Sequence, residues 1–175
     1  MNIRATTPAD LDAVMAIIEE ARRTIAALGI DQWQKGSPNR AMLTRDMSLG
    51  QGRVVTLEDG IAATFAVVYT GEPTYDRMED GAWLTPDLDA DGVCSYIAIH
   101  RVAIALAHRG SGIATAIMEY AEGFARILGK GSLRIDTHAG NTVMRRMLEK
   151  NGFIHCGTIH LENGDPRVAY EKPLR

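Results

Sequence analysis

A glycine-bearing turn between an apolar stretch and a helical pattern constrains this chain more than any other feature. Residues 96–104 are apolar enough for a buried strand, and residues 115–125 repeat apolar side chains at helical spacing. The turn between them has the sequence HRGSGIA over residues 108–114. The first N–H groups of a helix have no partner within it, and glycines let an anion approach them closely. The sequence therefore predicts a strand, a turn and a helix that together bind a phosphate-containing ligand.

The spacing within the turn distinguishes between classes of phosphate ligand. A P-loop needs a lysine directly after its second glycine, and none follows Gly110 or Gly112. A dinucleotide-binding turn needs a third Gly or Ala where Thr115 stands. Arg109, Gly112 and Ala114 instead form the pattern Arg-x-x-Gly-x-Ala, which resembles the acetyl-CoA loop of the GNAT superfamily of N-acetyltransferases. The alternative, from the residues alone, is an ordinary tight turn before a helix.

A second motif follows about thirty residues later. Residues 133–138 have the pattern of a strand with a short exit, and residues 142–150 that of a helix. Asn141 is placed to cap that helix at its start, and Gly152 follows its end, which is the usual helix punctuation. This segment resembles the other GNAT signature, in which Asn and a short helix precede Lys-x-Gly-Phe and a final strand. Two motifs in this order identify the chain as a member of the superfamily.

The order of the predicted elements indicates the fold class. Strand, helix, helix, three strands, helix, strand, helix and two strands make an α/β chain with a mixed sheet, and the resemblance implies the GNAT fold with helices flanking both faces. The resemblance covers residues 1–172, is strongest over residues 96–157, and points to a bacterial subgroup of the superfamily. We therefore expect one N-acetyltransferase domain over residues 1–175, in which residues 71–92, rich in Gly, Pro and Asp, form a long connection.

Charge and composition exclude several classes of partner. The net charge of −3 is spread along the chain, so we expect no nucleic-acid partner. The chain has no apolar run of 18 residues and no signal-like start, so we expect no membrane partner and a cytoplasmic location. Cys94 and Cys156 lack C-x-x-C spacing, and the histidines show no paired ligand spacing, so we expect no metal. A homodimer is left open.

The resemblance implies that acetyl-CoA is the acyl donor. It places the pantetheine arm on the backbone of residues 102–104 and the phosphates on residues 109–115, while the Asn141 side chain reaches the arm. Asn141 can equally be a simple helix cap, or both. The implied cofactor-binding residues are Val102, Ala103, Ile104, Arg109, Gly110, Ser111, Gly112, Ile113, Ala114, Thr115 and Asn141.

Direct acetyl transfer to an amine needs a proton acceptor and a donor for the leaving thiolate. His100, on the strand before the turn, is the candidate base, with a packed core histidine as the alternative. By strand alternation it shares a face with residues 98 and 102, unless a bulge breaks the parity. The general acid is open, because Leu148 stands where many GNAT enzymes carry a tyrosine. The substitutes are Tyr75, Tyr96 and His138.

The acceptor pocket is expected near the first two helices. Trp33 and Gln34 lie in the loop between them and are candidate substrate-binding residues, together with Trp83 from the long connection. Trp33 can equally be a plug between helices. These features predict an N-acetyltransferase that acts on a small-molecule or peptide amine. The alternative is a catalytically weak or inactive acyl-CoA-binding sensor on the same fold, which the missing tyrosine favours.

Overall fold

The computed structural model describes residues 1–174, which divide into two compact units. The first unit comprises residues 1–67 and 100–116, and the second comprises residues 68–99 and the chain from residue 117 onward. Strand β5 (Tyr96–Ile104) and helix α3 (Ile113–Ile127) each pass from one unit into the other. The segments of the units alternate along the sequence, so the expectation of a single domain over the whole chain stays a prediction.

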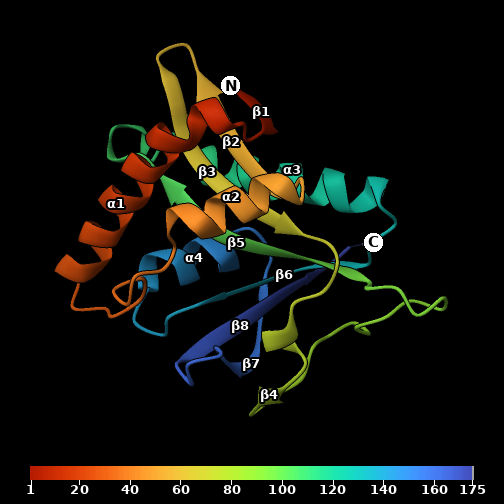
Figure 1. Cartoon of the computed structure of the whole chain (residues 1–175). Helices are drawn as coiled ribbons and strands as arrows, with labels where there is room; N and C mark the ends of the chain where they lie inside the picture. The colour runs from red at the N-terminus through yellow and green to blue at the C-terminus, as the bar shows by residue number, and fades with distance from the viewer. Residues whose placement is uncertain (175) are drawn as a thin grey trace. The chain divides into compact units, whose positions relative to one another are not determined.

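The described residues form a mixed sheet of eight strands with the order β1-β2-β3-β5-β6-β8-β7-β4 (Figure 1). Strands β5 and β6 are parallel, and the neighbours β1–β2, β2–β3, β6–β8, β8–β7 and β7–β4 are antiparallel. This confirms the predicted α/β class with a mixed sheet. The remaining elements are α1 (Leu11–Ala27), α2 (Arg40–Ser48), α4 (Thr142–Lys150), β1 (Asn2–Ala5), β2 (Gly52–Leu57), β3 (Gly60–Val68), β4 (Met78–Glu79), β6 (Ser132–Thr137), β7 (Ile154–His160) and β8 (Pro166–Pro173).

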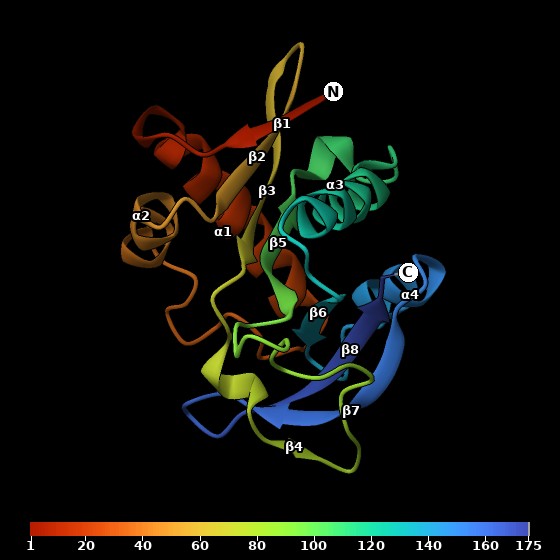
Figure 2. The ribbon, with the colours of Figure 1, turned by 90° about the vertical axis from the view of Figure 1, so that its right-hand side faces the viewer.

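In the first unit, α1 and α2 cover one side of strands β1–β3, and α3 begins on the other side (Figure 2). Apolar residues at helical spacing make α1 amphipathic, and Thr7 and Asp10 form a capping box just before it. Arg4 donates two hydrogen bonds to the Asp10 carboxylate, at 2.7 and 2.8 Å. The core beneath α1 and α2 consists of Val14, Ile17, Ile18, Ala21, Leu43, Val54 and Ala103.

In the second unit, β8 presents alternate side chains to opposite faces. Tyr170 accepts a hydrogen bond from Arg145 of α4, and Lys172 pairs with Glu122 of α3, so both helices lie on one face. Glu171 lies between them, faces the opposite side of the sheet, and contacts Leu84 and Thr85 of the long connection at residues 71–92. One face of this part of the sheet is therefore covered by helices and the other by a long irregular segment.

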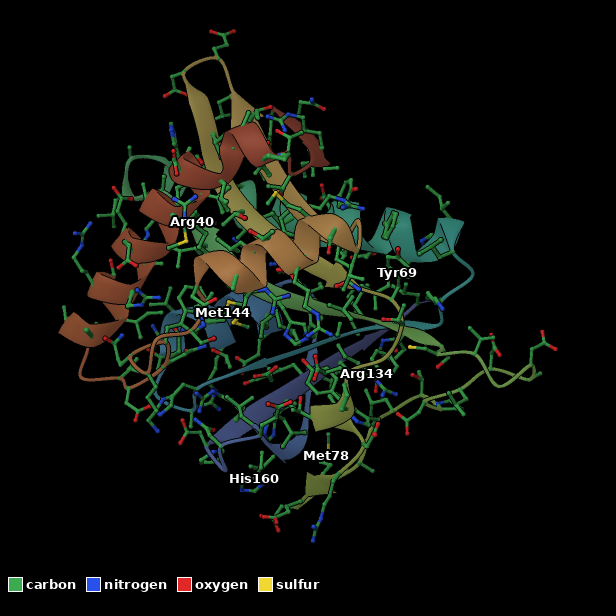
Figure 3. The ribbon with its side chains drawn as sticks, in the orientation of Figure 1. Arg40, Tyr69, Met78, Arg134, Met144 and His160 are labelled. Carbon is green, nitrogen blue, oxygen red and sulfur yellow. The ribbon has the colours of Figure 1, made fainter. Side chains whose placement is uncertain are left out.

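That connection is more structured than its composition suggested. It contains a short turn of helix at Pro73–Tyr75 and strand β4, which pairs with β7. Arg134, labelled in Figure 3, projects from β6 toward it and bonds the carbonyl of Thr85 at 2.7 Å. Its guanidinium lies 4.4 Å from the centre of the Trp83 ring and is fully buried. The connection is held to the sheet by buried charge as well as by apolar contact.

Among residues 1–174, no helix combines the length and the apolar character that a membrane span requires.

Candidate functional site

The predicted strand, turn and helix are present in the first unit. A short helical turn at Leu106–His108 follows β5, and α3 begins at Ile113 directly after Gly112. Gly110 and Gly112 have φ values of 78° and 85°, which glycine adopts at little cost. Among the described residues, no atom other than those of their chain neighbours lies within 4 Å of a Cβ added at either glycine. The turn therefore offers open space in front of the first N–H groups of α3.

Three residues from other elements of the first unit contact this turn. Glu20 of α1 accepts a hydrogen bond from the Leu106 backbone N–H at 3.1 Å, and Thr24 lies 3.5 Å from the Arg109 guanidinium. The His108 ring lies 3.3 Å from the Asp59 carboxylate at the β2–β3 hairpin. Arg109 is exposed and makes only this long contact with Thr24 among the hydrogen bonds described for it. Its guanidinium can therefore turn toward a phosphate without breaking a strong pair.

Strand β5 changes direction at Arg101, whose φ is 56°. A left-handed residue breaks the alternation of a strand, and His100, Arg101 and Val102 are accordingly all half-buried. The parity expected for residues 98, 100 and 102 is therefore interrupted at this point. Beyond it, Ala103 is buried and Ala105 donates a hydrogen bond to the carbonyl of Ala62 at 2.9 Å.

Asp46 of α2 lies against this part of β5 and was not found from the sequence. Arg101 donates to both of its carboxylate oxygens, each at 2.7 Å. Burial raises the pKa of Asp46, while the charges of Arg101 and then His100 oppose that rise. The sequence signal for it was its spacing: Asp46 follows Leu43 by three residues, which places its carboxylate on the same buried face of α2.

Asn141 and Leu148 lie in the second unit. The Asn141 side chain accepts a hydrogen bond from the Met144 N–H at 3.2 Å, so its capping role is confirmed, and its contact with the pantetheine arm stays a prediction. Leu148 is fully buried on α4, so this position contributes packing and no proton donor.

The three substitute acids all have hydrogen-bond partners within the second unit. The Tyr75 hydroxyl donates to Asp136 at 2.8 Å, and burial raises its pKa well above the usual value. The Tyr96 hydroxyl accepts from the Glu72 N–H, and burial raises its pKa to about 12. His138 accepts from the Gly140 N–H through Nδ1 at 3.0 Å. Both phenols therefore keep their protons at neutral pH, and their roles as acids stay predictions.

The candidate acceptor residues are divided between the units. Trp33 packs against the core beneath α1, as the helix-plug interpretation expects, and its carbonyl accepts a hydrogen bond from Arg22 at 3.0 Å. The Gln34 side-chain amide donates to the carbonyls of Arg22 and Gln32. Trp83 lies in the second unit and donates to the Tyr75 carbonyl at 2.9 Å. Their contacts with an acceptor stay predictions.

The first unit thus contains His100, the backbone of residues 102–104, the turn at residues 109–115, Trp33 and Gln34. Asn141 and Trp83 belong to the second unit. Within residues 1–174, no group of three or more His, Cys, Asp or Glu side chains is arranged to hold a metal ion.

Comparisons with known proteins agree with these features. Residues 53–153 match the family model described as the acetyltransferase (GNAT) family. A GNAT-family acetyltransferase from Streptococcus agalactiae is 35% identical, with 99% of this chain and 95% of that one covered and a TM-score of 0.87. One from Listeria monocytogenes is 20% identical, covering 99% and 94%, with a TM-score of 0.72. A ribosomal-protein-alanine N-acetyltransferase from Brucella melitensis, 20% identical over 99% and 100%, shares the fold at a TM-score of 0.67. No curated protein sequence matches the chain significantly.

Proposed function

The chain belongs to the GNAT family of acetyltransferases, and from this premise we propose that it transfers an acetyl group from acetyl-CoA directly to an amine. The observation that supports this most is the open glycine turn at the start of α3. The two left-handed glycines leave space for phosphate oxygens beside the N–H groups of residues 113–115. Arg109, which is exposed and makes a long contact with Thr24 within residues 1–174, supplies a positive charge at the same place.

The residues of the first unit fit the rest of the donor as well. The backbone of residues 102–104 follows the bend in β5 and leads into the turn, so an extended arm and its pyrophosphate would be bound by consecutive segments. When bound, acetyl-CoA supplies a thioester carbonyl: the amine nitrogen bonds to its carbon, the carbon–sulfur bond breaks, and the sulfur leaves as a thiolate. His100, on the same strand, accepts the proton that the amine must lose.

A sensor that binds acyl-CoA without turnover is the second candidate. The buried Leu148 favours it, because that position offers no proton to the leaving sulfur. An enzyme needs another donor, such as water or one of the protonated phenols of the second unit. The acceptor of the enzyme is proposed to be a small-molecule or peptide amine.

A screen of amines for release of free thiol from acetyl-CoA distinguishes these candidates. Polyamines, amino acids, aryl-alkyl amines and peptides are each incubated with protein and acetyl-CoA, and the acetylated product is identified by mass spectrometry. Thiol release that requires an amine and is lost when the glycine turn is altered, as in Gly112→Val, supports the enzyme. Tight binding of CoA without product from any class supports the sensor, and absence of CoA binding contradicts both.

A further inference from the structure

Arg101 adopts a backbone conformation that its own side chain disfavours. Three described residues other than glycine have positive φ, and of these Trp33 and Asp80 lie outside strands, whereas Arg101 lies inside β5. For a residue with a Cβ, the left-handed region is unfavourable unless its surroundings hold it there. We call this position, with its φ of 56°, the Arg101 bend.

The Asp46–Arg101 pair supplies the contact that can hold the bend. Nε and Nη2 of Arg101 donate to different oxygens of Asp46, each at 2.7 Å, so the guanidinium is fixed in direction as well as in position. The two side chains are 16% and 9% exposed, which limits screening by solvent. Asp46 is itself anchored, because its carbonyl accepts a hydrogen bond from the Gln51 N–H at 2.8 Å.

The bend determines what β5 presents on either side of it. His100 precedes Arg101 directly, and the backbone of residues 102–104 follows it. If β5 were regular at Arg101, residues 102–104 would be offset by one position along the strand. Their side chains and backbone groups that now face inward would then face outward, and the reverse. A positive charge on the His100 ring would oppose the rise that burial causes in the pKa of Asp46, so the two side chains lie within electrostatic range of each other. The pair therefore contacts the one residue of β5 that lies between the two groups on which the proposed reaction depends.

We propose that Asp46 is a positioning residue for acyl-CoA binding, which acts through Arg101 by holding the bend that places the backbone of residues 102–104 and the ring of His100. The proposal rests on the proposed function, since it needs β5 to carry the pantetheine arm. It assigns a binding role to a helix that the sequence motifs do not include.

The first test compares Asp46→Asn with a matched control, Asp10→Asn. Asp10 also accepts two hydrogen bonds from one arginine, and both carboxylate side chains are 9% exposed. CoA itself is the probe, with its dissociation constant measured by calorimetry and the sign of φ at Arg101 followed by backbone NMR shifts. Asp46→Asn should weaken CoA binding about fivefold or more, as expected for releasing a left-handed residue. Asp10→Asn should lower the melting temperature and leave CoA affinity unchanged.

A second pair of variants separates conformation from charge and remains decisive if Asp46→Asn fails to fold. Arg101→Gly removes the ion pair with Asp46, but glycine adopts a positive φ at little cost. Arg101→Ala also removes the ion pair, and alanine still has the energetic penalty of a Cβ at positive φ. The proposal predicts that Arg101→Gly binds CoA more tightly than Arg101→Ala, and that adding Asp46→Asn to Arg101→Gly causes no further loss.

The outcomes that overturn the proposal are distinct from those that overturn the function. If the parent protein binds no CoA, the proposed function fails, and the inference fails with it. If the parent binds CoA but Arg101→Gly and Arg101→Ala lose affinity equally, the guanidinium acts by its charge and the positioning role is wrong. If Asp46→Asn folds and binds CoA with unchanged affinity, the positioning role of Asp46 is wrong as well.

Discussion

Gly112 and Gly164 form a matched pair at the scale of single residues. Their φ values are 85° and 84°, and among the described residues both lack neighbours within 4 Å of an added Cβ beyond the adjoining chain. Valine at either position meets the same backbone penalty, but only Gly112→Val places a branched side chain in the proposed phosphate position. We expect Gly112→Val to weaken CoA binding at least about tenfold, or about 1.4 kcal/mol by calorimetry. Equal affinities in the two variants would move the pyrophosphate elsewhere.

His100 is tested by a substitution that keeps its size. If the ring accepts the proton of the amine, His100→Gln should lower turnover by about 10²–10⁴ and leave CoA affinity nearly unchanged. Turnover is measured with an amine found in the thiol-release screen, and melting temperature is measured on the same preparation. A variant that melts earlier but turns over normally per folded molecule would show that His100 is a packing residue.

The start of α1 gives a prediction at the scale of elements. The Arg4 guanidinium lowers the pKa of Asp10 below its usual value, so Asp10 binds protons more weakly in the folded chain than in the unfolded one. The resulting stability is full above about pH 4, near the unfolded pKa, and decreases as pH falls toward the folded pKa. Asp10→Asn should therefore lower the melting temperature at pH 7, and its difference from the parent should shrink below about pH 4. A constant difference across this range would contradict the linkage.

The buried pair under the connection gives a second prediction for elements. Glu171 accepts hydrogen bonds from Arg134 at 3.0 Å and from Ser132 and Thr85, and both charged side chains are fully buried. Because the buried Arg134 would then pair, among the described residues, only with the exposed carboxylate of Asp87, Glu171→Gln should reduce the free energy of unfolding by about 3 kcal/mol in urea. Glu162→Gln, at an exposed position, is the control and should change it little. A small loss at Glu171 would mean that Asp87 alone compensates the charge of Arg134.

For the whole molecule, the expected effect is stabilisation by the acyl donor. A ligand at a hundredfold excess over its dissociation constant adds about 2.7 kcal/mol to folding. In a protein of this size that corresponds to a rise in melting temperature of about 5–10 °C. Acetyl-CoA should give this shift and ATP much less, as measured by scanning calorimetry. Equal shifts with both ligands would indicate general anion binding.

The sequence predicted the features that depend on neighbouring residues. The strand–turn–helix around Gly112 and the cap at Asn141 are short-range patterns, and the structure confirms them. The Arg101–Asp46 and Arg134–Glu171 pairs, by contrast, join residues 55 and 37 positions apart. Such pairs form only when separate elements pack together, and the hydrophobic periodicity of the sequence does not predict them. The sequence left a bulge in this strand open but did not place it at Arg101, since the partner that holds Arg101, Asp46, lies on helix α2.

The alternating faces of β8 limit where the second unit can change in length. Tyr170 and Lys172 contact helices, while Glu171 contacts the connection on the opposite face. One inserted or deleted residue upstream within the strand would rotate each of these side chains to the wrong face at once. Insertions are therefore expected to be tolerated at residues 162–164, in the hairpin tip between the end of β7 and the start of β8. Loop grafts or affinity tags placed there should leave the packing of both faces undisturbed.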